Sequence, residues 1–187
     1  MNRKQLAHIL RAAATIAEDP EIVVIGSQAI LGSFSEEELP IEATRSIEAD
    51  VAFRSDPDEM KADKIEGAIG ENSRFHNTYS YYGQGVSIGT AQLPKGWTER
   101  VVMYEFEDSK PSKAVCLEPH DLIISKLVAN REKDREFATA LIRYGLVDPA
   151  ILFERVELLQ LPGAVIRRVR ESIMRRVKEA GNVGPET

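Results

Sequence analysis

Two stretches decide the fold of this chain: Glu21-Ile-Val-Val-Ile-Gly-Ser-Gln-Ala-Ile-Leu-Gly32 and Ile47-Glu-Ala-Asp-Val-Ala-Phe53. The first predicts a buried strand over residues 22–25 that turns at Gly26-Ser27 into a helix beginning at Gln28. Such a turn leaves free backbone N–H groups at the start of the helix, and these donors suit an anionic phosphate. Gly26 permits close backbone approach or a positive φ, and Ser27 adds a hydroxyl donor.

The second stretch alternates between apolar and polar residues, which is typical of a strand with one buried face. Its period of two places Glu48 and Asp50 side by side on the same face. Neighbouring carboxylates repel each other, and a hard divalent cation such as Mg²⁺ relieves that repulsion by taking oxygen ligands. We therefore expect a metal beside a phosphate-binding turn. The simpler alternative is a half-exposed strand whose polar face happens to be acidic.

The order of these features resembles the nucleotidyltransferase (polymerase-β-like) superfamily. A further stretch, Leu117-Glu-Pro-His-Asp-Leu-Ile-Ile-Ser-Lys-Leu-Val-Ala-Asn-Arg-Glu-Lys-Asp134, is similar to a segment of small bacterial nucleotidyltransferases of the DUF6036, AbiEii and MenT-toxin kind. The segment Leu93-Pro-Lys-Gly-Trp-Thr-Glu-Arg100 shares the likeness, and the resemblance spans residues 20–145.

The resemblance implies an α+β fold, in which a mixed sheet is flanked by helices and followed by a C-terminal helical part. We expect a nucleotidyltransferase-like core over residues 1–117 and a helical part over 118–187, packed together as one compact unit. The implied activity is Mg²⁺- or Mn²⁺-dependent transfer of a nucleotide from an NTP to a hydroxyl on RNA (a tRNA 3′ end) or on a protein. Such a protein can be the toxin of a toxin–antitoxin pair, with a cognate antitoxin as its partner.

The resemblance also assigns roles to single residues. Glu48 and Asp50 would bind the metal and act in catalysis. Gly26, Ser27 and Gln28 would contact the nucleotide, chiefly its phosphates. Many polymerase-β-like enzymes add a third carboxylate on a later central strand, but the expected region, Gly85-Val-Ser-Ile-Gly89, offers only Ser87. This departure keeps open a catalytically silent binding or scaffold protein with the same fold, and a phosphohydrolase that uses the same metal site.

Three further residues have competing interpretations. Lys126 lies just off an apolar helical stripe, as surface lysines often do, but the resemblance makes it a catalytic and nucleotide-binding cation. Asp134 either supplies the missing acidic function or caps the following helix, and it can share a site with Lys126 only if the chain bends between them. Arg45 either reaches the triphosphate or forms a surface ion pair.

The composition is that of a soluble globular protein with 187 residues and a net charge of −6. We expect a cytoplasmic location, because a single cysteine fits a reducing compartment and no apolar run is long enough to cross a membrane. Three histidines without ligand spacing give no support to a zinc site.

Basic residues gather in the predicted helix over residues 165–178, although the whole chain is acidic. The apolar stripe of that helix directs most arginines outward, where they can contact RNA or simply face solvent. The candidate RNA contacts are Arg167, Arg168, Arg170 and Arg175.

Other elements are expected from periodicity and turn residues. They are helices over 3–18 and 56–70, strands over 101–107 and 114–117, and helices from Pro119 onward that break at 131–134, 145–149 and 161–163. The aromatic segment 74–89 can stack on a base or pack on the sheet. Residues 181–187 are expected to fray.

Overall fold

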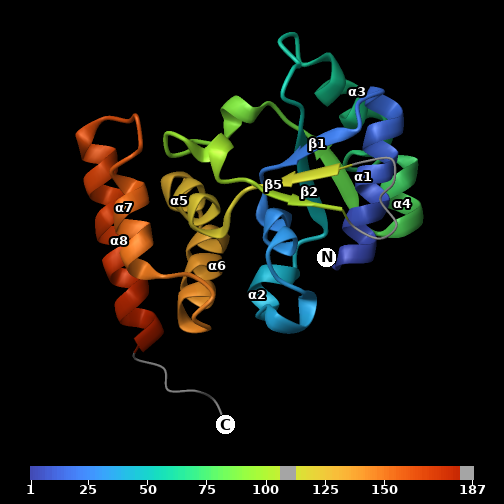
Figure 1. The fold of residues 1–187 in the computed structure, drawn as a ribbon. Coiled ribbons are helices and arrows are strands. Elements are labelled where there is room, and N and C mark those ends of the chain that lie inside the picture. The colour runs from blue at the N-terminus through green and yellow to red at the C-terminus, as the bar shows by residue number, and fades with distance from the viewer. Residues whose placement is uncertain (106–112, 182–187) are drawn as a thin grey trace.

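The protein folds into a mixed five-stranded sheet with helices on both faces, as the computed structural model shows for residues 1–105 and 113–181 (Figure 1). The strand order is β3-β2-β1-β5-β4. The central strand β1 pairs antiparallel with β2 and parallel with β5. The strands are β1 (Glu21–Val24), β2 (Glu48–Ala52), β3 (Tyr82–Gly85), β4 (Val102–Tyr104) and β5 (Lys113–Cys116).

Helices make up most of the remaining chain. The α-helices are α1 (Arg3–Ala17), α2 (Ile41–Thr44), α3 (Met60–Ile69), α4 (Arg74–Tyr79), α5 (Pro119–Ala129), α6 (Glu132–Arg143), α7 (Pro149–Val156) and α8 (Gly163–Gly181). The short 3₁₀ helices found in the described residues are η1 (Ser27–Gly32), η2 (Glu36–Glu38), η3 (Ile88–Thr90) and η4 (Trp97–Glu99).

The helices form two groups around the sheet. In Figure 1, α1, α3 and α4 lie together on one side, and α1 and α3 pack on each other and on β3. On the other side, α5 packs against η1, and α5–α8 pack among themselves. One hydrophobic cluster runs through both groups, from Leu6 and Ile9 in α1 to Val169 and Ile173 in α8.

The predicted α+β class is confirmed, and most element positions agree with the sequence analysis. The helix expected from Gln28 is instead the 3₁₀ helix η1, which begins at Ser27. The helix expected from Asp56 begins at Met60, although the Asp56 carboxylate accepts hydrogen bonds from the backbone N–H groups of Lys61 and Ala62 at 3.0 and 2.9 Å. Segment 74–89 contains both a helix and a strand, and the expected breaks separate α5, α6, α7 and α8.

Two expectations reach beyond the described residues, namely the end of the strand predicted over 101–107 and the tail at 182–187. Among the helices in the described part of the chain, none has the length and apolar character needed to cross a membrane.

Candidate functional site

A cleft of about 330 Å³ lies between the sheet and helix α5, and we call it the carboxylate cleft. It brings together residues from β2, β3, α5 and the turn after β1, which are far apart in the sequence. Its lining residues are Ile25, Gly26, Glu48, Asp50, Gln84, Val86, Thr90, Ala91, Gln92, Ser125, Lys126, Val128, Ala129 and Arg131.

Gly26 lies directly against the carboxyl group of Asp50. The backbone N–H of Ile25 donates a hydrogen bond to the carbonyl oxygen of Asp50 at 3.2 Å, which continues the pairing of β1 with β2. A Cβ atom added to Gly26 would stand 1.6 Å from Oδ2 of Asp50. Its φ of −86° is ordinary, so close approach, and not a positive φ, is the reason that glycine is needed here.

Glu48 and Asp50 share one face of β2, as the period of two predicts. Ala49 and Val51 are buried on the other face, whereas both acids are half-buried in the cleft. Burial and then the neighbouring Glu48 carboxylate, which also hydrogen-bonds to it, raise the pKa of Asp50 to about 6. Two partly desolvated acids held this close are the electrostatic arrangement that a cation stabilises.

Tyr82 and Gln84 of β3 stand beside the two acids. The parallel register pairs Glu48 with Tyr82 and Asp50 with Gln84. Burial and then the charge of Glu48 raise the pKa of Tyr82 to about 12, so its hydroxyl stays protonated and can donate to Glu48. Gln84 therefore occupies the position beside Asp50. It lies one residue before the segment 85–89, in which a third carboxylate was expected, and its side chain is an amide.

Lys126 and Asp134 meet because the chain bends sharply between α5 and α6. Asn130 ends α5 with a left-handed φ of 58°, and α6 starts two residues later. Lys126 Nζ consequently lies 3.2 Å from Oδ1 of Asp134, although eight positions separate the two residues. Asp134 is fully buried, and Lys126 is only 8% exposed. Asp134 also accepts a hydrogen bond from the backbone N–H of Arg131, the N-cap residue of α6, so it takes the capping role considered from the sequence.

Lys126 presents a buried positive charge to the carboxylate cleft. Burial lowers its pKa, while the charges of Asp134 and Asp50 act in the opposite direction. Burial also disfavours the charge of Asp134, but the hydrogen bond from Arg131 and the charge of Lys126 outweigh it and hold the pKa of Asp134 below its usual value. Arg131, which the sequence analysis did not single out, lines the cleft and places Nε 2.7 Å from Oδ2 of Asp134.

The structure places Ser27 and Gln28 outside the set of residues that line the cleft. Ser27 is half-buried at the start of η1, next to the cleft residue Gly26. Gln28 is fully buried, and its Nε2 donates to the carbonyl oxygen of Ser46 at 3.3 Å. A direct nucleotide contact by Gln28 is therefore not retained, because its side chain belongs to the core.

Arg45 lies in a separate, larger cavity of about 470 Å³ between α2, α6 and α8. That cavity has no lining residue in common with the carboxylate cleft. Four arginines and four glutamates line it, so its charges balance, and Arg45 itself forms an exposed ion pair with Glu136 of α6. Of the two interpretations of Arg45 from the sequence, the structure therefore shows the surface ion pair.

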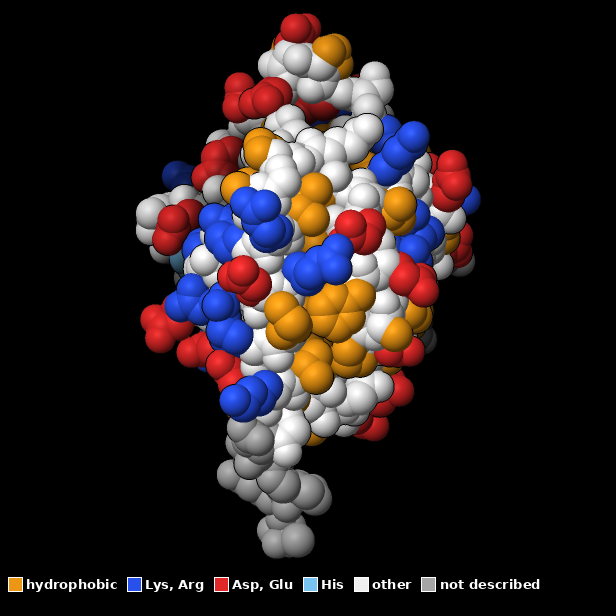
Figure 2. All heavy atoms as spheres, turned by 90° about the vertical axis from the view of Figure 1, so that its left-hand side faces the viewer, with side chains coloured by type: hydrophobic (Ala, Val, Ile, Leu, Met, Phe, Trp, Pro, Cys, Tyr) orange, Lys and Arg blue, Asp and Glu red, His pale blue; other side chains and the backbone are white. Residues whose placement is uncertain are grey.

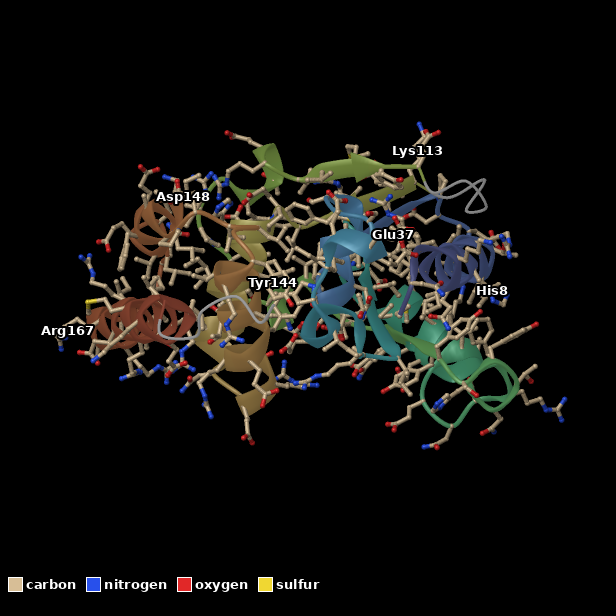
Figure 3. The ribbon with its side chains drawn as sticks, turned by 90° about the horizontal axis from the view of Figure 1, so that it is seen from below. His8, Glu37, Lys113, Tyr144, Asp148 and Arg167 are labelled. Atoms are coloured by element: carbon tan, nitrogen blue, oxygen red, sulfur yellow. The ribbon has the colours of Figure 1, made fainter. Side chains whose placement is uncertain are left out.

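The candidate RNA-binding arginines are all exposed on α8. Figure 2 shows this side of the molecule, where Lys and Arg side chains gather beside an apolar area. Arg168 donates to the carbonyl oxygen of Val128 at 2.8 Å, and Arg170 pairs with Glu157 of the same surface. Seen from below in Figure 3, Arg167 lies at the far side of the molecule from His8 of α1.

The residues present fit a divalent cation through Glu48 and Asp50. Their carboxylates offer hard oxygen atoms, and Gln84 adds an amide oxygen to the same cleft. The pKa of Asp50 is raised first by burial and then by Glu48, and both causes would be relieved by a bound cation. No group of three or more His, Cys, Asp or Glu side chains with metal-binding geometry occurs within residues 1–105 and 113–181. The remaining ligands of a bound ion would therefore be water and phosphate oxygens.

The structure thus combines a mixed sheet, paired strand carboxylates beside a glycine turn and a buried lysine in one cleft. The chain belongs to the family described as "nucleotidyltransferase of unknown function (DUF6036)", which it matches over residues 4–159. No curated protein and no solved structure matches the chain.

Proposed function

We propose that this protein is a divalent-metal-dependent nucleotidyltransferase that moves a nucleotide from an NTP to an acceptor hydroxyl. The hydroxyl oxygen bonds to the α-phosphate, and pyrophosphate leaves. The observation that carries the proposal is the carboxylate cleft itself, in which Glu48 and Asp50 face the buried ammonium group of Lys126. A triphosphate with a bound cation needs negative ligands for the metal and a positive group for its own oxygens, and this cleft contains both.

The roles of the residues follow from their charge and placement. Glu48 and Asp50 would hold Mg²⁺ or Mn²⁺, and the bound ion would neutralise charge on the triphosphate and lower the pKa of the attacking hydroxyl. Gly26 leaves room for Asp50 and lines the cleft, and this supports a phosphate-binding role for the backbone N–H groups of the Gly26-Ser27 turn. Lys126 stabilises the charge that develops on the transferred phosphoryl group, and Asp134 holds Lys126 in position.

The acceptor that we propose is RNA, with a tRNA 3′ end as the first candidate and a protein hydroxyl as the second. The exposed arginines of α8 support RNA, because they offer phosphate contacts on a chain that is otherwise acidic. If the protein is the toxin of a toxin–antitoxin pair, a protein antitoxin would be its partner in the cytoplasm. Expression of the wild type should then arrest growth, and expression of Asp50→Asn should not.

A transfer assay tests the proposal. The protein is incubated with Mg²⁺ or Mn²⁺, each of the four NTPs labelled at the α-phosphate, and either total tRNA or a protein extract. We expect label in a macromolecular acceptor with wild type and with Asp63→Asn, an exposed control on α3, but not with Asp50→Asn or Lys126→Met. No label with any combination would contradict the proposal.

A catalytically silent binding protein is the second candidate, and Gln84 favours it. The site has an amide beside Asp50 where a third carboxylate would assist proton removal. This alternative predicts metal-dependent NTP binding without transfer. It also predicts that Gln84→Glu raises metal affinity, because a third carboxylate would join Glu48 and Asp50.

A further inference from the structure

A further pocket, of about 340 Å³, adjoins the carboxylate cleft. The two share Ala91 and Gln92 as lining residues, so a single short segment after β3 forms the boundary between them. We call it the Trp97 pocket after the only tryptophan of the chain. Its apolar wall consists of Ile88, Leu93, Trp97, Leu159 and Leu161.

The two cavities differ sharply in charge. The carboxylate cleft is lined by Glu48, Asp50, Lys126 and Arg131, whereas none of the described residues that line the Trp97 pocket is charged. The polar side chains of the Trp97 pocket are two amides, Gln92 and Gln160. A nucleotide has the same division, with charged phosphates at one end and an uncharged planar base with hydrogen-bonding edges at the other.

Polar contacts hold the Trp97 segment in place from two directions. The backbone N–H of Lys95 donates to the carbonyl oxygen of Leu158 at 2.9 Å. Arg100 donates through Nε and Nη2 to the buried carboxylate of Asp121 in α5, at 2.8 and 3.1 Å. Gly96, with a left-handed φ of 79°, makes the turn that leads into η4. Trp97 is thus fixed while its ring remains partly exposed beside an open cavity.

We propose that the Trp97 pocket is a nucleobase subsite, in which a base stacks on the ring of Trp97 and the amides of Gln92 and Gln160 contact its edge. The base belongs either to the NTP in the carboxylate cleft or to the terminal nucleotide of an RNA acceptor. This inference rests on the proposed function, since it assumes that the carboxylate cleft binds a triphosphate. Base–aromatic stacking and amide contacts are common means of recognising single nucleotides.

Fluorescence of Trp97 tests the subsite directly, because no other tryptophan contributes to the signal. The wild type is titrated with each NTP and Mg²⁺, with a single-stranded RNA tetranucleotide, and with inorganic triphosphate and Mg²⁺ as a probe that has no base. We expect saturable quenching by an NTP or by the RNA but none by inorganic triphosphate. Quenching by NTPs assigns the pocket to the donor base, and quenching by RNA assigns it to the acceptor.

Variants make the test independent of the optical signal. Trp97→Leu should weaken binding of the quenching ligand by about 5- to 150-fold, as loss of one stacked base does. It should leave inorganic triphosphate binding unchanged in calorimetry. Trp97→Phe keeps a smaller ring, and its affinity for the quenching ligand should lie between those of the wild type and Trp97→Leu. Gln160→Ala changes an exposed residue, so it tests the pocket even if Trp97→Leu does not fold.

The outcomes separate the two proposals. One set of results would overturn the subsite and leave the proposed function standing. In that case NTP binding depends on Asp50, Trp97 fluorescence is unchanged by every ligand, and Trp97→Phe and Gln160→Ala bind with normal affinity. Quenching by RNA without Asp50-dependent NTP binding would support the subsite and contradict the proposed function. Neither quenching nor binding would overturn both.

Discussion

At the scale of single residues, Asp50 is the residue on which the account depends most. Its carboxyl group is half-buried, touches Glu48 and lies against the backbone of Gly26. These contacts are unfavourable for a charged side chain in the absence of a cation. Residues that reduce the stability of a fold are often those that a function requires.

The pH dependence of stability follows from the raised pKa of Asp50. The folded protein binds this proton more tightly than the unfolded chain does, so the stability of the metal-free protein falls as the pH rises from 3.8, the ordinary pKa of an aspartate, through about 6. Above this pH range, the stability that protonated Asp50 contributes is fully lost. Asp50→Asn should remove this loss and stabilise the metal-free protein at pH 8 by about 1–3 kcal/mol.

Urea unfolding at pH 4 and pH 8, with and without Mg²⁺, measures this effect. Mg²⁺ should stabilise the wild type and leave Asp50→Asn unchanged, because a ligand stabilises only the state that binds it. Asp63→Asn is the control, and it should behave as the wild type does. A lower stability of Asp50→Asn than of wild type at pH 8 would contradict the interpretation.

Gly26 gives a second test at this scale. Gly26→Ala would place a methyl group on the Asp50 carboxylate and should reduce NTP affinity by more than about tenfold, besides destabilising the fold by about 1–3 kcal/mol. Gly67→Ala is the matched control, because a Cβ there meets nothing within 4 Å inside helix α3. It should stabilise by up to about 1 kcal/mol. Calorimetry and urea unfolding measure both effects, and equal behaviour of the two variants would refute the role of Gly26.

At the scale of elements, the junction between α5 and α6 builds the positive side of the cleft. The left-handed cap at Asn130 turns the chain so that Asp134 of α6 accepts from Lys126 of α5 and from the backbone of Arg131. The ammonium group of Lys126 also lies 4.8 Å from the ring centre of Phe137. The pair is therefore fixed by both helices and by the bend between them.

Removal of Asp134 should be costly for this reason. Asp134→Ala leaves Lys126 buried without its partner and removes a helix cap, so we expect a loss of about 3–5 kcal/mol in unfolding free energy. Glu132→Ala, at an exposed position in the same turn, should change it by less than about 0.5 kcal/mol. Urea unfolding measures both, and a loss below about 1 kcal/mol in Asp134→Ala would show that the pair is not structural.

The sequence predicted those parts of the site that depend on local order. Alternation within one strand was sufficient to place Glu48 and Asp50 on a common face, and the glycine turn was sufficient to place Gly26 beside them. The sequence alone could not decide whether the chain bends at Asn130, because an asparagine is compatible with both a continued helix and a left-handed cap.

The remaining parts depend on contacts between distant segments. The position of Gln84 beside Asp50 follows from the register of β3 on β2, which a single sequence does not specify. Arg45 pairs with Glu136, which is 91 positions away. Gln28 was expected at a helix N-terminus facing the ligand, but η1 packs between the sheet and α5 and buries that side chain.

At the scale of the whole molecule, exposed arginines gather on α8 of a protein with a net charge of −6, and this is the surface that we propose for RNA. Arg167 and Arg175 are exposed and make no hydrogen bond or ion pair with the described residues, whereas Arg168 and Arg170 have partners on the protein. Phosphate contacts should therefore come first from Arg167 and Arg175. The family match ends at residue 159, so α8 lies beyond it.

RNA binding by α8 predicts a strong dependence on salt. Replacing both Arg167 and Arg175 by Gln should weaken RNA affinity and reduce the slope of log affinity against log salt by about 1.4 to 1.8, which is the effect of two lost phosphate contacts. Lys4→Gln with Lys64→Gln, at exposed positions on α1 and α3, removes the same charge from the opposite group of helices and is the control. Filter binding over a range of salt concentrations measures the slopes. Equal slopes for the two double variants would exclude α8 as the RNA surface.

The most direct test of the central claim is calorimetric titration of the protein with each NTP, with Mg²⁺ or Mn²⁺ and without either, for wild type, Asp50→Ala and Asp63→Asn. We predict NTP binding that requires the divalent cation, that is retained in Asp63→Asn, and that is lost in Asp50→Ala because one of the two proposed protein carboxylate ligands is gone. Binding that is unaffected by Asp50→Ala, or no binding of any NTP with either cation, would contradict the assignment of the carboxylate cleft as a nucleotidyltransferase site.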